Sequence, residues 1–263
     1  MKILITGNKG FIGSHFEFFW KDTNNKIVTY EWQEDVLPRI EGLDWVIHLG
    51  AISSTTERDV AKVMKQNVDF SIWLYEECRK YDVDMQWASS ASVYGDNKGR
   101  YFNESDPVDP RSPYSWSKYL FEHYVEKNPT HRKCQGFRYF NVYGPEYESH
   151  KGLQASPFYQ FKNQAEVNGV IKVFEGSDEM RRDFVHVSEL IKVQFQFMNQ
   201  DVDENGVWNI GMGTTMSFMD VAKKYANQYG ALIQEIPMPE NLKASYQYYT
   251  CADLTKLNAT LNG

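Results

Sequence analysis

Two residues with the chemistry of a proton-transfer pair, Tyr114 and Lys118, stand four positions apart in the stretch Ser112-Pro113-Tyr114-Ser115-Trp116-Ser117-Lys118. Ser112 is a good helix N-cap and Pro113 suits the first helical position, so a helix is expected from here to about Glu126. Four residues apart, the two side chains share one helix face. An ammonium beside a phenol favours the phenolate and lowers the tyrosine pKa from about 10, which lets Tyr114 take a proton from a hydroxyl.

The same spacing also fits an ordinary amphipathic helix, in which the tyrosine packs and the lysine is solvated. The chemical interpretation therefore depends on what the rest of the chain supplies.

Composition limits the classes of function. The 263 residues suffice for one large domain or a domain with a smaller lobe. Lys and Arg number 28 against 35 Asp and Glu, a net charge of −7, which disfavours nucleic-acid binding. Cys78, Cys134 and Cys251 are scattered and lie in no metal-ligand pattern, so we expect reduced thiols, no metal and a cytoplasmic location. No export signal and no membrane-spanning segment is apparent.

A glycine-rich turn follows the first apolar run. The strand expected at residues 2–5 leads into Thr6-Gly7-Asn8-Lys9-Gly10-Phe11-Ile12-Gly13, and a helix is expected after it. Glycines at this spacing allow a tight turn, close approach of a pyrophosphate to backbone N–H groups and close helix–strand packing. A plain glycine-rich turn is the alternative.

Glu31 ends the second expected strand, at residues 26–30. A carboxylate there can accept hydrogen bonds from the adenosine ribose and would repel a 2′-phosphate, which slightly favours NAD over NADP. Only a short helical stretch, at about residues 35–40, is expected before the strand at 44–49, so the chain looks trimmed where a doubly wound half usually has another strand and helix.

The following strands also end in small or polar residues. After the strand at 44–49, Gly50-Ala51-Ile52 leaves room for a cofactor, and a long helix is expected from Ser53 to about Tyr81, with Gln66 and Asn67 as polar residues in its middle. The strand at 84–88 runs into Ser89-Ser90-Ala91-Ser92-Val93-Tyr94-Gly95. Ligands bind beyond the carboxyl ends of parallel strands, so Ser90 is a candidate partner for a substrate hydroxyl, with a simple turn role as the alternative.

The second half of the chain continues the strand and helix pattern. A strand is expected in Gly136-Phe137-Arg138-Tyr139-Phe140-Asn141-Val142-Tyr143-Gly144-Pro145, and further helices at 158–168, 188–198 and 217–229. Arg181 and Arg182 stand near the turn Glu175-Gly176-Ser177, and the planar guanidinium suits a diphosphate, with an ordinary surface position as the alternative. The tail containing Tyr246 is too irregular to assign.

Together these stretches resemble the extended short-chain dehydrogenase/reductase family, specifically its nucleotide-sugar epimerases and dehydratases. The resemblance rests on the glycine turn, on Ser89 to Gly95, on Tyr114 with Lys118, and on Arg138 to Pro145. Within the family, the stretches His150-Lys151-Gly152, Phe174-Glu175-Gly176-Ser177 and Arg182-Asp183-Phe184-Val185 are most similar to those of epimerases that act on ADP-heptose.

The resemblance implies an α/β fold, a Rossmann-like doubly wound parallel sheet with a small C-terminal substrate-binding lobe. We expect residues 1–144 and 183–211 to form the dinucleotide-binding domain, and 145–182 and 212–263 the lobe. The expected catalytic residues are Tyr114, Lys118, Ser90 and Lys151. NAD or NADP is expected to contact Gly7, Gly10, Phe11, Ile12, Gly13, Glu31, Leu49, Gly50, Ala51, Ser53, Gln66, Asn67, Tyr114, Lys118 and Val142. The sugar nucleotide is expected to contact Ser90, Asn141, Lys151, Phe174, Glu175, Gly176, Ser177, Arg182 and Tyr246.

The implied mechanism is a transient oxidation. Tyr114 removes a hydroxyl proton while hydride passes to the nicotinamide, Lys118 holds the nicotinamide ribose and keeps the tyrosine pKa low, and Ser90 hydrogen-bonds the reacting oxygen. The keto intermediate turns, hydride returns to its opposite face, and Lys151 is the candidate second acid/base or a phosphate contact. The substrate would be an ADP-heptose, and we expect a homo-oligomer.

Three alternatives follow. A 4-epimerase of a UDP-, GDP- or dTDP-hexose needs the same serine, tyrosine and lysine. A 4,6-dehydratase is disfavoured, because Ala91-Ser92 follows Ser90 where those enzymes carry an Asp-Glu pair. A catalytically inactive dinucleotide-binding regulatory protein would keep the fold without turnover.

Overall fold

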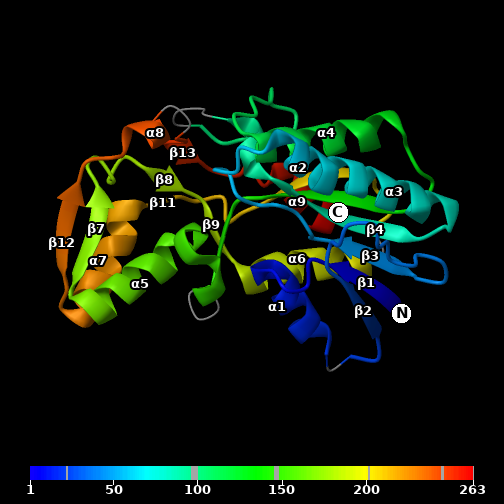
Figure 1. Ribbon diagram of the computed structural model, residues 1–263, viewed down its shortest axis with the longest axis horizontal. Helices are drawn as coiled ribbons and strands as arrows, with labels where there is room; N and C mark the ends of the chain where they lie inside the picture. Colours follow the sequence, from blue (N-terminus) through cyan, green and yellow to red (C-terminus); the bar gives the residue numbers. More distant parts are fainter. Residues whose placement is uncertain (22, 96–99, 145–147, 201, 244–245, 263) are drawn as a thin grey trace.

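A six-stranded parallel sheet forms the centre of the molecule, for which the computed structural model describes residues 1–21, 23–95, 100–144, 148–200, 202–243 and 246–262. The strand order is β10-β5-β4-β3-β1-β2 (Figure 1). The strands are β1 (Lys2–Thr6), β2 (Lys26–Tyr30), β3 (Trp45–His48), β4 (Asp84–Ser90), β5 (Cys134–Tyr139) and β10 (Gly206–Ile210). Every residue of β3 and β5 is buried, as expected for parallel strands that are covered on both faces.

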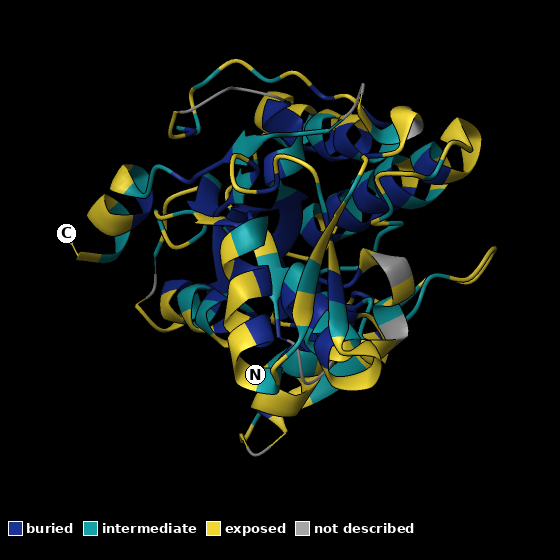
Figure 2. Cartoon of the chain, turned by 90° about the vertical axis from the view of Figure 1, so that its left-hand side faces the viewer, coloured by how far each residue is buried: buried dark blue, intermediate teal, exposed yellow. Residues whose placement is uncertain are grey.

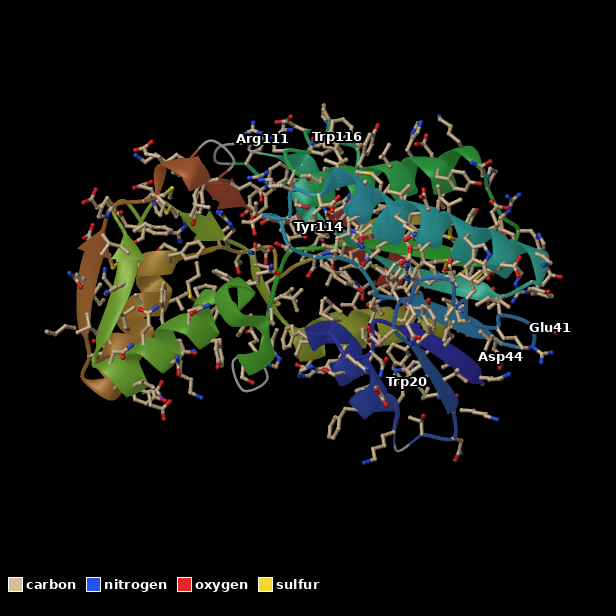
Figure 3. The ribbon with its side chains drawn as sticks, in the orientation of Figure 1. Trp20, Glu41, Asp44, Arg111, Tyr114 and Trp116 are labelled. Carbon is tan, nitrogen blue, oxygen red and sulfur yellow. The ribbon has the colours of Figure 1, made fainter. Side chains whose placement is uncertain are left out.

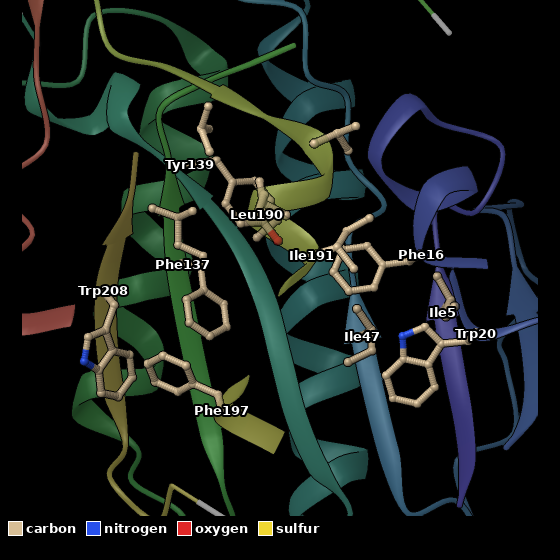
Figure 4. Packing of buried hydrophobic residues seen from close by; sticks show 14 of the residues in the cluster. Ile5, Phe16, Trp20, Ile47, Phe137, Tyr139, Leu190, Ile191, Phe197 and Trp208 are labelled. Carbon is tan, nitrogen blue, oxygen red and sulfur yellow. The ribbon is translucent and has the colours of Figure 1, made fainter. Parts of the chain in front are cut away.

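Helices cover both faces of this sheet, which confirms the predicted doubly wound α/β fold. The first face packs against α1 (Phe11–Trp20) and α6 (Val187–Asn199), and the second against α3 (Phe70–Lys80) and α4 (Pro113–Lys127). Figure 4 shows the first core, where Ile5 and Ile47 of the strands meet Phe16 and Trp20 of α1. Leu4, between Ile3 and Ile5, faces the other core, because alternate residues of a strand point to opposite faces. Buried residues therefore concentrate in the sheet and exposed ones on the outer sides of the helices (Figure 2).

A smaller lobe lies beside the carboxyl ends of the strands, at the left of Figure 1. Its core joins α5 (Pro157–Asn168) and α7 (Phe218–Tyr229) to the parallel pair β7 (Val170–Phe174) and β12 (Leu232–Ile236). The short strands β8 (Arg181–Arg182), β11 (Met216–Ser217) and β13 (Tyr249–Thr250) form a second small sheet, and β6 (Asn141–Tyr143) pairs with β9 (Phe184–His186). The remaining short elements are α2 (Val60–Met64), α8 (Glu240–Lys243), α9 (Thr255–Asn262), the 3-10 helices at Ala91–Tyr94 and Ser149–Gln154, and a π-helix at Lys65–Asp69.

The segment between β2 and β3 differs from the expected short helix at residues 35–40. Its described residues contain a tight turn, with an isolated bridge between Gln33 and Val36, and the Tyr30 hydroxyl donates to the Val36 carbonyl at 2.7 Å. The segment is too short to add a strand, so β2 stays at the edge of the sheet.

The helix expected from Ser53 begins later. The continuous helical stretch runs from Val60 to Lys80, and Asp59 caps it by accepting a hydrogen bond from the Lys62 N–H. Residues 53–56 all have hydroxyl side chains, and each is an acceptable helix N-cap. The residue types alone therefore did not show that Asp59 is the N-cap. The π-turn at Lys65–Asp69 was also not expected.

The predicted division of the chain into two folding units stays a prediction. The position of one helix, α9, differs from that prediction. The assignment put residues 212–263 in the lobe, whereas α9 packs against β10 of the large sheet. Leu257 belongs to the same core as Trp208, and the Trp208 indole donates to the Thr260 hydroxyl at 3.0 Å. Pro145 of the predicted motif and the His150 side chain lie outside the description.

A buried ion pair ties α4 to β5. The Arg138 guanidinium contacts both carboxylate oxygens of Glu122 at 3.0 and 2.6 Å, and the Ser89 hydroxyl also donates to Glu122. Both charged side chains are at most 7% exposed. Removing one partner would leave the other charge buried without compensation.

We therefore expect Arg138→Leu to lower the free energy of unfolding by about 3–5 kcal/mol. The matched control is Lys192→Ala, which breaks an exposed ion pair with Glu189 and should cost only about 0–1 kcal/mol. Urea unfolding followed by tryptophan fluorescence measures both. Equal losses in the two variants would contradict the role given to the buried pair.

Candidate active site

The start of helix α4 at Pro113 sets the directions of the Tyr114 and Lys118 side chains. Ser112 accepts a hydrogen bond from the Ser115 N–H at 3.1 Å, and the Ser115 hydroxyl accepts one from the Ser112 N–H at 2.9 Å. This reciprocal cap, with Pro113 in the first turn, fixes the start of the helix as the sequence predicted. Tyr114 lies on the side of α4 toward the sheet, while the exposed Trp116 lies above it (Figure 3).

Ser90, Tyr114 and Lys118 meet at the carboxyl end of β4. Ser90 is the last residue of that strand, and its side chain forms a hydrogen bond with Tyr114. The Lys118 ammonium lies 5.8 Å from the centre of the Tyr114 ring and donates to the Ala88 carbonyl at 2.8 Å. The parallel sheet thus brings together three residues that the sequence separates by up to 28 positions.

The pKa of Tyr114 differs from the expectation. Burial raises it above its usual value, and the hydrogen bond with Ser90 only partly opposes this. Lys118 is itself 6% exposed, and burial lowers its pKa to about 8, with the charge of Glu122 acting the other way. The prediction placed the ammonium directly beside the phenol, whereas the ammonium donates to a backbone carbonyl and lies 5.8 Å from the centre of the ring. Lys118 therefore does not lower the tyrosine pKa in this arrangement.

A cavity of about 480 Å³ lies in front of these residues. Its wall contains all the predicted cofactor contacts except Asn67, together with Ser90 and Lys151. The wall includes Gly7, Gly10, Phe11, Ile12, Gly13, Glu31, Leu49, Gly50, Ala51, Ser53, Gln66, Tyr114, Lys118 and Val142.

The glycine turn has the geometry of a dinucleotide cradle. Gly7 has φ of +75°, and a Cβ added to it would lie 2.6 Å from Gly50. A Cβ on Gly13 would lie 2.1 Å from the Gly7 carbonyl oxygen. Side chains at these positions would fill the space between β1, α1 and the end of β3, so the backbone is left open to a pyrophosphate at the helix N-terminus. The residues present fit a bound dinucleotide.

The end of the cavity at β2 is built from Glu31 and aromatic side chains. The Glu31 carboxylate accepts a hydrogen bond from the Lys9 N–H in the glycine turn at 2.5 Å. Tyr30, Trp32 and Phe70 line the same end, and the Tyr30 and Phe70 rings stack with centres 5.4 Å apart. Sequence reasoning identified Glu31 and missed these rings, although Trp32 directly follows it.

Asn67 does not line either large cavity. Its side chain is buried and bonds both the N–H and the carbonyl of Ile52, at 2.8 and 3.0 Å, and it donates to the Ser117 hydroxyl at 3.0 Å. Asn67 therefore joins the loop after β3 to α4. The neighbouring Gln66 does line the cavity.

A second cavity, of about 520 Å³, adjoins the first and extends to the lobe. Val142, Lys151 and Gln154 line both cavities. Five of the predicted substrate contacts are in its wall: Asn141, Lys151, Phe174, Arg182 and Tyr246. The Arg182 guanidinium lies 5.3 Å from the centre of the Tyr246 ring, which supports its position by a cation–π contact.

The other predicted substrate contacts lie elsewhere. Glu175 and Gly176 line a separate hollow of about 290 Å³ with Met238 and Lys243. Ser177 lines another, of about 280 Å³, which it shares with Phe174 and Tyr246. The turn after β7 directs its residues into different hollows, which the residue types alone did not indicate.

Lys151 is held by a residue that the sequence reasoning passed over. Its ammonium contacts the Glu148 carboxylate at 2.7 Å and lies 4.4 Å from the centre of the Phe11 ring. An acidic residue three positions before the lysine was the only signal in the sequence.

No group of three or more His, Cys, Asp or Glu side chains within the described ranges is arranged to hold a metal ion. Every helix in those ranges is too short or too polar to cross a membrane. The glycine turn and the cavity beside it are those of a dinucleotide-binding α/β protein, and Tyr114 and Lys118 both line that cavity.

Comparison with known proteins gives the family. The model of the NAD dependent epimerase/dehydratase family matches residues 3–211, and the chain belongs to this family. It is 36% identical over 219 residues to the ADP-L-glycero-D-manno-heptose-6-epimerase of Brachyspira hyodysenteriae, covering 81% of this chain and 68% of that protein.

Solved structures agree on the fold. The Helicobacter pylori ADP-L-glycero-D-manno-heptose-6-epimerase superposes with a TM-score of 0.86 at 25% identity, covering 99% of this chain and 90% of that one. The Thermotoga maritima UDP-glucose 4-epimerase, solved with UDP-glucose, gives 0.85 at 26% identity, covering 100% and 93%. The predicted membership of the nucleotide-sugar epimerases and dehydratases is confirmed.

Lys118→Met should change how stability depends on pH. The folded-state pKa of Lys118, about 8, lies below the value of about 10.4 usual for an unfolded chain, so the unfolded state binds more protons between these values. Wild-type stability therefore gains from this residue as pH rises from 8 to 10. Lys118→Met lacks this titration. Between pH 8 and 10 we therefore expect the free energy of unfolding of wild type to rise, relative to that of Lys118→Met, by an amount on the order of 2–3 kcal/mol.

Urea unfolding at pH 7, 8.5 and 10 tests this change. The control is Lys127→Met, at a largely exposed side chain, whose difference from wild type should stay constant. A constant difference for Lys118→Met as well would refute the assigned burial cost.

Glu31 should decide between the two dinucleotides. Its carboxylate would repel a 2′-phosphate, so wild type is expected to bind NAD more tightly than NADP, and Glu31→Ser should narrow the ratio of the two dissociation constants about tenfold. Isothermal titration measures both constants, with the exposed Glu41→Ser as the control. Equal binding of the two dinucleotides by wild type would be the contrary result.

Proposed function

We propose that this protein is an NAD(P)-dependent nucleotide-sugar epimerase that acts by transient oxidation and reduction, with an ADP-heptose as substrate. The observation that carries the proposal is the meeting of two cavities at Val142, Lys151 and Gln154. The first is lined by the glycine turn and Tyr114, the second by Arg182 and Tyr246. A dinucleotide in the first and a sugar nucleotide in the second would place a sugar hydroxyl near the phenol. The similarity to the Brachyspira enzyme supports the choice of heptose.

When bound, the dinucleotide would supply the hydride acceptor and return the hydride in each turnover. The protein's own residues handle the proton. The Tyr114 phenolate takes the proton from the sugar hydroxyl, and the Ser90 hydroxyl donates a hydrogen bond to the same oxygen as it becomes a carbonyl. On reduction, the proton returns from Tyr114 to the oxygen of the epimer, so protons and electrons balance over one turnover.

Because the pKa of Tyr114 is raised, its phenolate needs a positive charge nearby, and Lys118 is the candidate. A buried phenolate is costly without a compensating charge, and Lys118 carries an ammonium on the same helix face, 5.8 Å from the centre of the Tyr114 ring. We infer that Lys118 supports the phenolate once the cavity is filled, and that it contacts the nicotinamide ribose. Lys151, at the boundary of the cavities, is our candidate for the acid/base group in the second orientation of the sugar.

A 4-epimerase acting on a hexose nucleotide is the second candidate. The similarity to the Thermotoga UDP-glucose 4-epimerase, over the full length of this chain, favours it. We further propose a cytoplasmic homo-oligomer, in keeping with three buried free cysteines and the exposed Trp116 and Leu120 on one face of α4.

Incubation of the purified protein with the two ADP-heptose epimers, UDP-glucose and UDP-galactose tests the proposal. Interconversion of the heptose epimers, read by chromatography with mass detection, is the expected result. In D2O the product should carry no new C–D bond, because the transferred hydrogen stays on the cofactor between steps. Conversion of hexose nucleotides alone would select the second candidate. Dinucleotide released on denaturation, without turnover of any sugar, would indicate a binding protein.

Tyr114→Phe should lower kcat about 10²–10⁴-fold, because it removes the proton acceptor. The matched control is Tyr119→Phe, which removes a phenol from the same helix in a partly buried position away from both cavities. Full activity of Tyr114→Phe would exclude the proposed chemistry.

A further inference from the structure

Glu148 is a fully buried carboxylate at the connection between the large sheet and the lobe. Its side chain is 0% exposed and accepts four hydrogen bonds. One oxygen accepts from the Gly144 N–H at 2.9 Å and the Ser156 hydroxyl at 2.6 Å. The other accepts from the Ser156 N–H and the Lys151 ammonium, both at 2.7 Å.

These donors come from three places along the chain. Gly144 follows β6 of the β6–β9 pair, Ser156 is the N-cap of α5 in the lobe, and Lys151 lies between them in the 3-10 helix. One carboxylate therefore joins Gly144, at the end of β6, to Ser156, at the start of α5. Burial alone would raise the pKa of Glu148, but the hydrogen bonds from Lys151, Ser156 and Gly144 lower it below its usual value, so the group stays charged.

Lys151 has no other carboxylate partner among the described residues. Its side chain is 21% exposed and lines both cavities. A free lysine side chain carries about 2 kcal/mol of rotamer entropy, so an unanchored ammonium would occupy one position only part of the time. The buried Glu148 and the Phe11 ring, 4.4 Å away, hold it at the boundary of the cavities.

We propose that Glu148 is a positioning residue that holds the Lys151 ammonium at the boundary between the cofactor and substrate cavities. Glu148 is shielded from both cavities and acts on the reaction only through Lys151. The inference rests on the proposed epimerase function for its kinetic consequence, and on the contacts alone for the position of Lys151.

A double-mutant cycle tests the kinetic part. Glu148→Gln removes the charge with little change of shape, and Lys151→Met removes the ammonium. If Glu148 acts through Lys151, each single variant should lose about tenfold or more in kcat, and the double variant should be no slower than Lys151→Met alone. Losses that multiply in the double variant would overturn the proposal.

Two further variants control for a general loss of structure. Glu104→Gln makes the same change at another largely buried carboxylate, which accepts from the Asn209 N–H at 2.7 Å outside both cavities. It should leave kcat unchanged. Glu148→Asp keeps the charge and replaces Glu148→Gln in the cycle if the latter does not fold, and the same coupling to Lys151 is expected.

A measurement without turnover separates this inference from the proposed function. Reductive ¹³C-methylation labels the lysines, and comparison with Lys151→Arg assigns the Lys151 signal in the NMR spectrum. We expect that signal to lie apart from those of exposed lysines and to move toward them in Glu148→Gln but not in Glu104→Gln. An unchanged signal in Glu148→Gln would refute the positioning role, even if the enzyme is active. A shifted signal with no turnover of any sugar nucleotide would keep it and reject the epimerase.

Discussion

The burial of one cation, Lys118, is the constraint around which the site is organised. An ammonium removed from water is costly, and its pKa near 8 expresses that cost. The protein offsets it with the Ala88 carbonyl and with the charge of Glu122, which in turn is bound by Arg138 and Ser89. This chain of polar contacts runs through α4, β4 and β5. The site is therefore inseparable from the core, because the groups that hold Lys118 also hold the helix on the sheet.

Parallel strands explain why the remaining residues converge. The carboxyl ends of β1, β3 and β4 lie at one edge of the sheet, and small or hydroxyl residues stand at or just after each end: the glycine turn, Gly50-Ala51 and Ser89-Ser90. Glycine is needed where backbones meet, as at Gly7 and Gly13, and the same lack of side chains leaves room for a ligand. Close packing of the backbone and binding of a ligand thus both require glycine at these positions.

The sequence predicted those parts of the molecule that local patterns determine. The strands of the large sheet, the cap at Ser112 and the glycine turn follow from apolar runs, capping preferences and φ requirements. It did not predict features that depend on distant partners. Asn67 faces Ile52 and Ser117 because the unforeseen π-turn and the loop after β3 set its direction. The pKa of Tyr114 depends on how far the phenol is removed from water, and the spacing of residues on a helix does not reveal this. The Tyr30 and Phe70 stack joins segments forty residues apart.

The proposed reaction requires most of the boundary between the two cavities, because the sugar must turn there. An epimerase must let the keto sugar present both faces to the same dinucleotide, so one side of the sugar must be free to turn while the nucleotide remains bound. Fixed contacts lie at the far end, where Arg182 is buried and packs near the Tyr246 and Phe218 rings. Small residues and hydroxyls lie at the near end, around Ser90 and Ser92. In the proposed reaction, the anchor for the nucleotide and the open space for the sugar would therefore come from different parts of the chain. Lys151 lines both cavities, and under our proposal its buried partner Glu148 would hold it in place while the sugar turns.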